Sequence, residues 1–447
     1  TDPNVVLTDS EKVNQFIVDC VSNLYLWEAD TDWTKYSDAE TYRSYSDHNE
    51  LFLKFINKED RWSFLTDDIE GTQGQFNGVT TTYGLSLIFG RFSNKPTSLF
   101  AIVLYVYKGS PADAAGIKRG DIIVGLNGGD LTESNYTDLY YSSTAKLTMG
   151  VLKDDAISVS PTPVDLKAVN MYEDPVQHYE VINFGGKKIG YLCYTGYQQQ
   201  SEGALKSVFA DFKSQGVSDV VLDLRYNGGG YAITAQKLAS ILAPQSVVKS
   251  KDVYLSRQWN ALYTEYFKNQ NTEYFIDTLN VNMNLNRVYA LVTGNTASAS
   301  EATLIGLKPY MDVVLIGDTT HGKYCGAYLM GVMDFYEDAV QYKYQNISNW
   351  GMYIMVYRYA NKSGYPTFVG GLPPEVRADE DYFDLKDFGD VTDPLLAVAV
   401  ERITGVKPLA ARSASGASSG SDALRRSLRV QPELTPRPRG FGVVIAN

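Results

Sequence analysis

Cysteine and histidine are scarce in this sequence of 447 residues, which contains three of each. They are Cys20, Cys193 and Cys325, and His48, His178 and His321. The cysteine spacings match neither a zinc knuckle nor a CxxC redox pair, and so few cysteines exclude a disulfide scaffold. A metal site built from several histidines would need almost all of them. We therefore expect no metal centre and no cofactor.

Long apolar runs and an excess of positive charge are also missing. No run reaches the roughly 20 apolar residues that a membrane-spanning helix needs, and the opening TDPNVVLTDSEK lacks the basic and apolar segments of a signal peptide. The sequence starts at Thr1 rather than Met, which fits a fragment whose targeting segment has been removed. Lys and Arg number 40 against 52 Asp and Glu, a net charge of −12. That sign argues against nucleic acid as a partner.

The sequence divides into four regions by its patterns of apolar and small residues. Residues 1–77 place apolar side chains at helical spacing and predict an N-terminal helical domain. Residues 78–168 carry short β-type runs and predict a β-rich domain. In residues 169–405 strand-like and helix-like runs alternate, which predicts parallel strands joined by crossover helices. Residues 406–447 are rich in Ser, Gly, Arg and Pro and predict a flexible basic tail. The expected fold class is α+β and multidomain, with an α/β core.

The most informative segment is RVYALVTGNTASASEATLIGLKPY, residues 287–310. An apolar strand is expected to end near Thr293, and small residues then lead into a helix. A serine on such a turn exposes its hydroxyl at the end of a parallel sheet, beside free N–H groups that stabilise a developing oxyanion. Ser298 and Ser300 are therefore both candidate nucleophiles. The pattern also fits an ordinary helix start, with Ser298 or Ser300 as N-cap and Glu301 in the first turn.

A glycine-rich turn ends the strand-like run DVVLDLRYNGGGY, residues 219–231. The three glycines at 228–230 permit close backbone approach, so that N–H groups of this run can point at a substrate carbonyl. The turn lacks the GK[ST] ending of a P-loop and the GxGxxG spacing of a dinucleotide fold. An oxyanion loop and a plain structural turn both remain open. Asp223 and Arg225 are interpreted as a strand-end ion pair.

A third segment, VVLIGDTTHGKYCG at residues 313–326, places His321 and Lys323 in a turn after an apolar strand. A serine hydroxyl needs a general base, either a histidine or a lysine whose pKa is lowered by burial. Nothing in the spacing pairs His321, His48 or His178 with a carboxylate. Lys323 can also be read as one of the many solvated basic residues.

In their order and spacing, these three segments resemble the carboxyl-terminal processing proteases, also called tail-specific proteases, which are Ser/Lys serine peptidases. The Asp-Leu-Arg-x-Asn-x-Gly-Gly turn of that family is matched by residues 223–230, and its Thr-Ala-Ser-Ala-Ser-Glu motif by residues 296–301. The family's general-base lysine follows the nucleophile at the spacing that separates Lys323 from Ser298. The resemblance covers about residues 10–405. It implies that Ser298 and Lys323 are the catalytic residues.

The β-rich region contains GSPADAAGIKRGDIIVGLNG, which is similar to the signature half of a PDZ domain. In the resembled family the PDZ domain precedes the catalytic core, binds the C-terminal residues of substrates and gates the active site. A PDZ domain adds an extended peptide to a sheet edge and captures its carboxylate with backbone amides. The matching loop here is Tyr83-Gly84-Leu85. The implied partners are proteins or peptides with exposed C-termini.

The resemblance implies a serine endopeptidase with a crotonase/ClpP-like core that forms an acyl-enzyme on Ser298. Backbone amides of Ala299 and of Gly228 or Gly229 would hold the oxyanion. Lys323 must be uncharged to act as the base, so we expect a rate that rises with pH. The implied location is the periplasm or cell envelope, with any membrane anchor supplied by a segment outside this sequence. The oligomeric state is left open.

One departure from the family pattern bears on catalysis. The family turn usually reads Gly-Lys-Gly-x-x-Gln, with the glutamine orienting the lysine, whereas Ala327 stands at that position here. Either another side chain holds the Lys323 ammonium group or the base is poorly organised. The second case gives an alternative function: a catalytically weak or inactive PDZ-containing peptide-binding or scaffold protein with the protease fold. A further alternative is an unrelated Ser/His hydrolase that uses His321.

Overall fold

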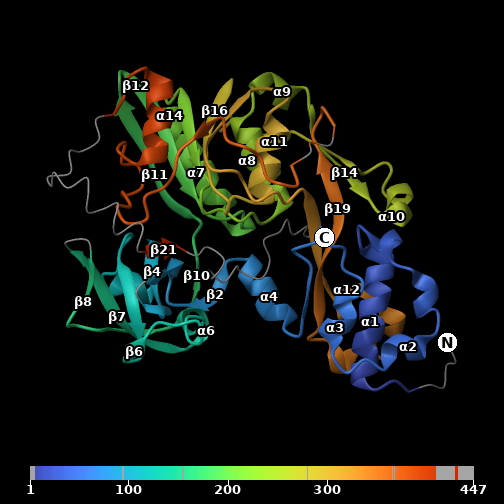
Figure 1. The fold of residues 1–447 in the computed structure, drawn as a ribbon. Coiled ribbons are helices and arrows are strands. Elements are labelled where there is room, and N and C mark those ends of the chain that lie inside the picture. Colours follow the sequence, from blue (N-terminus) through green and yellow to red (C-terminus); the bar gives the residue numbers. More distant parts are fainter. Residues whose placement is uncertain are drawn as a thin grey trace.

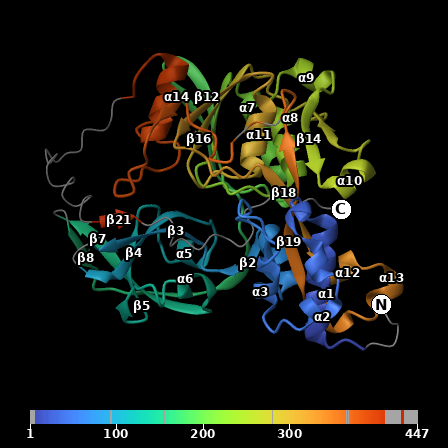
Figure 2. The same cartoon turned by 45° about the vertical axis from the view of Figure 1, so that its right-hand side comes forward.

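The computed structural model of the chain describes residues 6–92, 95–153, 156–278, 280–364, 366, 368–408 and 428–430. Figure 1 shows an α/β core with two further parts beneath it. A β-rich part lies under one end of the core, and a group of N-terminal helices lies under the other end, along the long strand β19 (Figures 1 and 2).

The central sheet of the core has the strand order β11-β12-β13-β16-β17-β20. Its strands are β11 (Val176–Phe184), β12 (Lys187–Tyr194), β13 (Asp219–Asp223), β16 (Arg287–Val292), β17 (Asp312–Gly317) and β20 (Val376–Arg377). The strands from β12 to β20 run parallel, and β11 joins β12 antiparallel. The predicted alternation of parallel strands and crossover helices is confirmed. The carboxyl ends of parallel strands lie at the same edge of a sheet. β13, β16 and β17 therefore end close together, and each leads into one of the predicted functional turns.

Helices cover both faces of this sheet. They are α7 (Glu202–Ser214), α8 (Ala232–Leu242), α9 (Gln245–Lys249), α11 (Ala299–Leu307) and α14 (Pro394–Thr404). Successive residues of a strand point to opposite faces. Accordingly Val221 packs in the hydrophobic cluster beneath α14, whereas its neighbours Val220 and Leu222 pack in the cluster that contains α7, α8 and α11. Burial on both faces explains why these strands are continuously apolar rather than alternating.

A second, antiparallel sheet extends from the core towards the N-terminal helices. Its strands are β1 (Phe64–Thr66), β14 (Val253–Trp259), β15 (Thr272–Tyr274), β18 (Cys325–Gly331) and β19 (Gly351–Ala360). β18 pairs along one edge of β19, and β1 and β14 share the other edge. Short helices accompany it: α10 (Ala261–Tyr266), α12 (Val332–Phe335), α13 (Asp338–Gln341) and the 3-10 helix η4 (Gln345–Ile347). This sheet therefore joins a strand from residues 64–66 to the turn that carries Lys323.

The N-terminal helices pack on this second sheet. They are α1 (Asp9–Leu24), α2 (Ala39–Arg43), α3 (His48–Leu53) and α4 (Ile69–Phe76), with the 3-10 helices η1 (Glu28–Asp30) and η2 (Trp33–Tyr36). α1 begins with a capping box, in which Thr8 and Glu11 each accept the other's backbone N–H. Its buried face, including Phe16 and Ile17, belongs to the same hydrophobic cluster as β19. The apolar side of α1 is thus buried against the second sheet.

The β-rich part contains an antiparallel sheet with its own hydrophobic cluster. Its elements are β3 (Leu85–Phe92), β4 (Lys95–Val106), α5 (Pro111–Ala114), β5 (Ile122–Leu126), β6 (Gly129–Asp130), α6 (Asp138–Tyr141), β7 (Thr144–Lys153), β8 (Ala156–Val159) and β9 (Val164–Lys167). A ribbon of β2 (Val79–Thr82) and β10 (Val169–Tyr172) connects it to the core, where η3 (Gln199–Ser201) precedes α7. A further apolar cluster joins its outer face to residues 382–388 of the core.

Most of the predicted flexible tail, residues 409–427 and 431–447, lies outside the described residues. The described tail residues form the short strand β21 (Leu428–Val430), which pairs antiparallel with Gly90 to Phe92 of β3. β3 pairs with β4 along its other edge. The tail strand therefore occupies the edge of β3 that β4 leaves open.

Candidate active site

The segment that carries Ser298 is a sharp turn between a buried strand and a helix. β16 ends at Val292, α11 begins at Ala299, and Ser298 between them has φ +58° and ψ −111°. A left-handed φ in a residue with a Cβ costs on the order of 1–3 kcal/mol and persists where the surrounding structure fixes it. The Ser298 Oγ is buried and has no hydrogen-bond partner among the described residues. The turn thus holds an unpartnered hydroxyl at the carboxyl end of the sheet.

Hydrogen bonds from the glycine-rich turn hold the serine turn in place. The carbonyl oxygen of Asn227 accepts the N–H of Ala297 at 3.0 Å and the hydroxyl of Ser300 at 3.1 Å. The Thr296 hydroxyl donates to the carbonyl of Leu224 at 2.8 Å. Ser300 therefore fixes one turn to the other, whereas Ser298 keeps its hydroxyl out of this network. That difference favours Ser298 over Ser300 as the chemically available serine.

Gly229 lies directly against Ser298. It has φ +108°, and a Cβ at this position would lie 2.8 Å from the Ser298 Cβ, so only glycine fits. Its N–H donates to Asn227 Oδ1 at 2.9 Å and is therefore engaged. Within the described residues, the N–H groups of Gly228 and Ala299 donate to no protein acceptor. Of the three predicted oxyanion donors, the structure thus leaves Gly228 and Ala299 open to a ligand.

Lys323 lies in the turn before β18 and is wholly buried. Its Nζ donates to the hydroxyl of Tyr353 at 3.2 Å and lies 4.9 Å from the centre of that ring. Burial lowers the pKa of Lys323 to about 8, although the charges of Cys325, Asp60 and Glu301 act in the opposite direction. About one tenth of this lysine is therefore uncharged at pH 7, and the fraction rises with pH, as a general base requires.

A tryptophan from the N-terminal part of the chain, Trp62, faces Lys323. The Trp62 ring centre lies 5.6 Å from the Lys323 Nζ. The indole N–H of Trp62 donates to His321 Nε2 at 3.1 Å, so the imidazole is neutral with its proton on Nδ1. His321 is thereby engaged in holding Trp62, which does not favour it as the base for Ser298.

Glu301 connects the serine turn to the lysine turn. Its Oε2 accepts the backbone N–H of Ser298 at 2.8 Å and that of Lys323 at 2.9 Å. Its Oε1 accepts the Gly322 N–H at 2.7 Å and the Thr320 hydroxyl at 2.6 Å. Burial raises the pKa of Glu301 to about 7, against the lowering effect of these four donors. One buried carboxyl group therefore fixes both predicted catalytic residues relative to each other.

The other two histidines lie in different surroundings. His48 Nδ1 is 2.7 Å from Asn14 Oδ1 in the N-terminal helices, and His178 Nε2 is 3.3 Å from Glu180 Oε1 on β11. Among the described residues, no group of three or more His, Cys, Asp or Glu side chains is arranged to hold a metal ion. The described helices include none that is both long and apolar enough to cross a membrane.

The predicted peptide-binding loop lies at the start of β3. Tyr83 is buried in the core of the β-rich part, and its hydroxyl donates to the carbonyl of Ser142 at 2.5 Å. Gly84 donates its N–H to the Thr82 hydroxyl at 2.9 Å, and Leu85 begins the strand. The tyrosine thus anchors the loop from inside, and the free edge of β3 starts at Leu85.

The Asp223–Arg225 pair is part of a buried charge network that reaches the β-rich part. Arg225 Nη2 lies 2.8 Å from Asp223, and Arg225 Nη1 lies 2.8 Å from Asp393 and 3.1 Å from Glu380. Arg119, from the PDZ-like signature segment, lies 2.8 Å from the same Glu380. The predicted strand-end ion pair is therefore present, and it belongs to a larger junction between the two parts.

Sequence reasoning did not find Tyr353 and Trp62. Tyr353 lies on β19, and Trp62 lies just before β1, far from Lys323 in the chain. Register brings them together, because Phe64 pairs with Tyr353 across β1 and β19. No local motif marks either residue, since both contacts depend on how distant strands pair.

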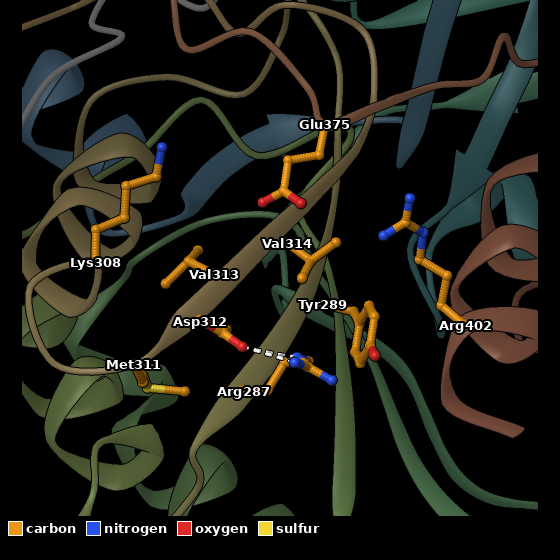
Figure 3. A pocket seen from close by; sticks show the side chains of 9 residues that line it. All are labelled: Arg287, Tyr289, Lys308, Met311, Asp312, Val313, Val314, Glu375 and Arg402. Atoms are coloured by element: carbon orange, nitrogen blue, oxygen red, sulfur yellow. Dashed lines mark hydrogen bonds and ion pairs between the residues drawn. The ribbon is translucent and has the colours of Figure 1, made fainter.

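A second, polar cavity of about 540 Å³ lies at the end of the central sheet opposite the candidate active site (Figure 3). It is lined by side chains at the beginnings of β16 and β17, including the ion pair Arg287–Asp312, and by Lys308, Glu375 and Arg402. Because β16 runs from Arg287 towards the Ser298 turn, this cavity lies at the far end of the strand from the candidate active site.

Comparisons with known proteins agree with this arrangement. The model of peptidase family S41 matches residues 188–378, and a PDZ-domain model matches residues 102–141. The "C-terminal processing peptidase, chloroplastic" of Tetradesmus obliquus is 24% identical over 321 residues, which are 69% of this chain and 61% of that protein. A "Probable CtpA-like serine protease" of Staphylococcus aureus (strain N315) is 25% identical over 71% of this chain and 57% of that protein. The chain thus spans about three fifths of the length of these relatives.

Solved structures show the same fold. The "Putative S41 protease" from Bacteroides fragilis NCTC 9343 is 26% identical, has a TM-score of 0.68 and covers 88% of this chain and 98% of its own. The "photosystem II D1 C-terminal processing protease" has a TM-score of 0.51 at 19% identity, covering 90% of this chain and 98% of its own. The predicted α+β multidomain fold and the predicted resemblance are confirmed. Residues 188–378 therefore belong to peptidase family S41, the family of the C-terminal processing serine proteases, and a PDZ domain precedes them in the same chain.

Proposed function

We propose that this protein is a serine endopeptidase that cleaves proteins or peptides through an acyl-enzyme on Ser298, with Lys323 as general base. The observation that carries the proposal is the buried Glu301 carboxyl group, which accepts the N–H of Ser298 and of Lys323 on one oxygen. The low pKa of Lys323 supports the same roles, since an uncharged amine can take a hydroxyl proton.

In the proposed reaction the Lys323 Nζ removes the Ser298 hydroxyl proton while Oγ attacks the scissile carbonyl. The N–H groups of Gly228 and Ala299 stabilise the tetrahedral oxyanion, and such a donor typically contributes about 10²–10³ in rate. Lys323 then passes its proton to the leaving amine, and an ester to Ser298 remains. Water, deprotonated by Lys323, hydrolyses this ester and regenerates the serine.

Substrate access requires movement of the segments that cover the nucleophile. Ser298 and Lys323 are both wholly buried, and Gly229 lies against the serine. A peptide reaches the Ser298 Oγ only after the chain around it opens. This closed arrangement fits an enzyme whose cleavage is triggered by substrate rather than constant.

The PDZ domain offers a means of selecting substrates by their C-termini. We propose that a substrate peptide adds to the open edge of β3, with its carboxylate at the loop of Gly84 and Leu85. Support comes from the antiparallel pairing of β21 with this edge, since the edge accepts an added strand. An extracytoplasmic location stays a prediction, which fractionation of the source cells tests.

The test of the proposed function is cleavage of an unfolded model protein with an apolar C-terminus, at pH 7 and pH 9. We expect cleavage by the wild type, a loss of at least about 10³-fold in Ser298→Ala and Lys323→Ala, and most of the rate retained in His321→Ala. Cleavage that needs His321 and tolerates Lys323→Ala would favour the Ser/His alternative. No cleavage by the wild type would favour the peptide-binding alternative.

A further inference from the structure

The amine of Lys323 needs a group that fixes its direction. A lysine side chain is a flexible stem of four carbons, and the bonds along it rotate freely. The lone pair of its Nζ must nevertheless point at the serine hydroxyl for proton transfer. The side chain of Ala327, four residues further on, is buried and carries no polar atom. The Lys323 Nζ donates a hydrogen bond to the hydroxyl of Tyr353 at 3.2 Å.

We propose that Tyr353 is the positioning residue for the general base, its hydroxyl accepting one N–H of Lys323 and so directing the lone pair towards Ser298. This inference rests on the proposed function, in which Lys323 is the base. Tyr353 itself does not touch substrate or the reacting oxygen. It acts through the lysine.

Tyr353 is held rigidly enough for this role. Its side chain is wholly buried on β19, which pairs with β1 through Phe64 and with β18 through Leu329. Its ring stacks on Phe64, with centroids 5.3 Å apart, and packs on Phe76 at 5.1 Å. A ring fixed by two strands and two aromatic neighbours holds its oxygen in one place, as a useful hydrogen-bond acceptor must.

Trp62 also lies close to the amine. Its ring lies 5.6 Å from the Lys323 Nζ, and its own N–H is used by His321. The two rings exclude water from the amine, so the Tyr353 hydroxyl replaces a solvent acceptor. Removing that hydroxyl therefore leaves one N–H of the lysine without this partner.

Tyr353→Phe isolates the hydroxyl, since the ring and its packing remain. Loss of the acceptor destabilises the ammonium form more than the amine, so the pKa of Lys323 falls further. The other titratable groups that face Lys323 stay in place; they are Glu301 on α11, Asp60 before β1, Cys325 on β18, His321 in the lysine turn and Tyr359 on β19. The rate falls because the lone pair is no longer directed.

The experiment compares the full chain as wild type, Tyr353→Phe and the control Tyr357→Phe, a buried tyrosine four residues along β19 whose ring packs on Trp259. Peptide cleavage is followed from pH 6 to pH 10. For Tyr353→Phe we expect kcat to fall about 10- to 100-fold, KM to stay within about twofold, and the acid limb to move to lower pH. Tyr357→Phe should match the wild type.

A second measurement needs no catalysis. In the Ser298→Ala chain labelled with ¹⁵N-lysine, the Lys323 Nζ resonance, assigned with Lys323→Arg, is titrated with and without Tyr353→Phe. We expect a lower midpoint with phenylalanine. An unchanged midpoint, or a loss of kcat with an unmoved acid limb, would mean that Tyr353 is only a packing residue and would overturn the inference. A wild type without cleavage would instead contradict the proposed function, and the titration would still decide the role of Tyr353.

Discussion

Gly229 and Ser298 are in such close contact that a single added carbon would force them apart. A Cβ on Gly229 would lie 2.8 Å from the Ser298 Cβ and 3.0 Å from the carbonyl oxygen of Ala297. Cβ atoms in proteins essentially never lie closer than 3.0 Å to a non-bonded heavy atom. The neighbours here are backbone atoms and a short side chain, which cannot move aside. The glycine-rich turn and the serine turn can therefore lie this close together only because residue 229 has no side chain.

For Gly229→Ala we expect a loss of cleavage of at least about 100-fold, because the alanine displaces the nucleophile by a fraction of an ångström or more. The matched control is Gly216→Ala, which also has a positive φ, +75°, but whose added Cβ meets nothing within 4 Å. Both variants should lose about 1–2 kcal/mol of stability from backbone strain. Steady-state rates and denaturant unfolding separate the two effects, and an active Gly229→Ala would disprove the close approach.

Glu301→Gln tests the connection between the two turns. A glutamine replaces one acceptor oxygen by an NH₂ group, which cannot accept a hydrogen bond. It faces either the N–H groups of Ser298 and Lys323 or the Gly322 N–H and the Thr320 hydroxyl, and the N–H hydrogen bonds on that side are lost. We expect kcat to fall about 100-fold and KM to change little. The control is Glu401→Gln on the exposed side of α14, which should leave kcat unchanged. Equal kcat values in the two variants would contradict this role of Glu301.

The pH dependence follows from the depressed pKa of Lys323, about 8. Cleavage should rise as pH increases through about 8, as the amine loses its proton. Stability should also rise with pH between about 8 and 10.5, since the unfolded chain binds the lysine proton in that window and the folded chain does not. Lys323→Met should remove this slope, worth about 3 kcal/mol. Unfolding free energies at pH 8 and pH 10 measure it, and a slope kept in Lys323→Met would rule the lysine out as its source.

Arg119→Met tests the junction between the PDZ domain and the core. Arg119 pairs with Glu380 at 2.8 Å with both side chains almost fully buried, and its Nε donates to the carbonyl of Lys386 at 2.7 Å. Breaking one side of a buried pair costs about 3–5 kcal/mol. We expect faster proteolysis in the PDZ domain of Arg119→Met. Arg287→Met, which breaks an exposed pair with Asp312, should cost below about 1 kcal/mol. Similar proteolysis of both would show that the junction adds no stability.

Truncation after Pro408 tests whether the tail competes for the edge of β3. A peptide with its carboxylate at Gly84 runs antiparallel along β3 and reaches Gly90, where β21 pairs, only if it is longer than about five residues. If the tail occupies the edge of β3 about nine tenths of the time, only about one tenth of the full chain can bind a long peptide. We therefore expect the truncated chain to bind a ten-residue apolar peptide about tenfold more tightly than the full chain does. A four-residue peptide should bind equally to both chains. Titration calorimetry gives both constants, and equal binding of the longer peptide would show that the tail does not compete.

The sequence was most informative where the determinants of structure are local. The apolar runs in residues 219–223, 287–292 and 312–317 predicted the parallel strands, since burial on both faces demands continuous apolar residues. The helical apolar spacing of residues 204–215 likewise predicted α7. The position of Ser298 after a strand and before a helix could also be predicted, because small residues and a helix start stand next to each other in the chain.

The contacts that complete the site depend on long-range pairing and could not be predicted. Tyr353 faces Lys323 because β18 and β19 pair antiparallel across a long connection, and Trp62 faces it because β1 adds to the other edge of β19. A one-residue slip in either register would turn the side chain to the opposite face. The pairing of Glu380 with both Arg119 and Arg225 has the same origin, since three distant segments meet there.

The pairing of Phe64 with Tyr353 has a consequence for the newly made protein. Tyr353 leaves the ribosome about 290 residues after Trp62, an interval of roughly 15–60 s at about 5–20 residues per second. Until β19 has been synthesised and has joined β1, Lys323 has neither its aromatic enclosure nor its acceptor. If Lys323 is the general base as proposed, cleavage becomes possible only when synthesis of the core is nearly complete, and the nascent chain cannot attack other polypeptides beside it.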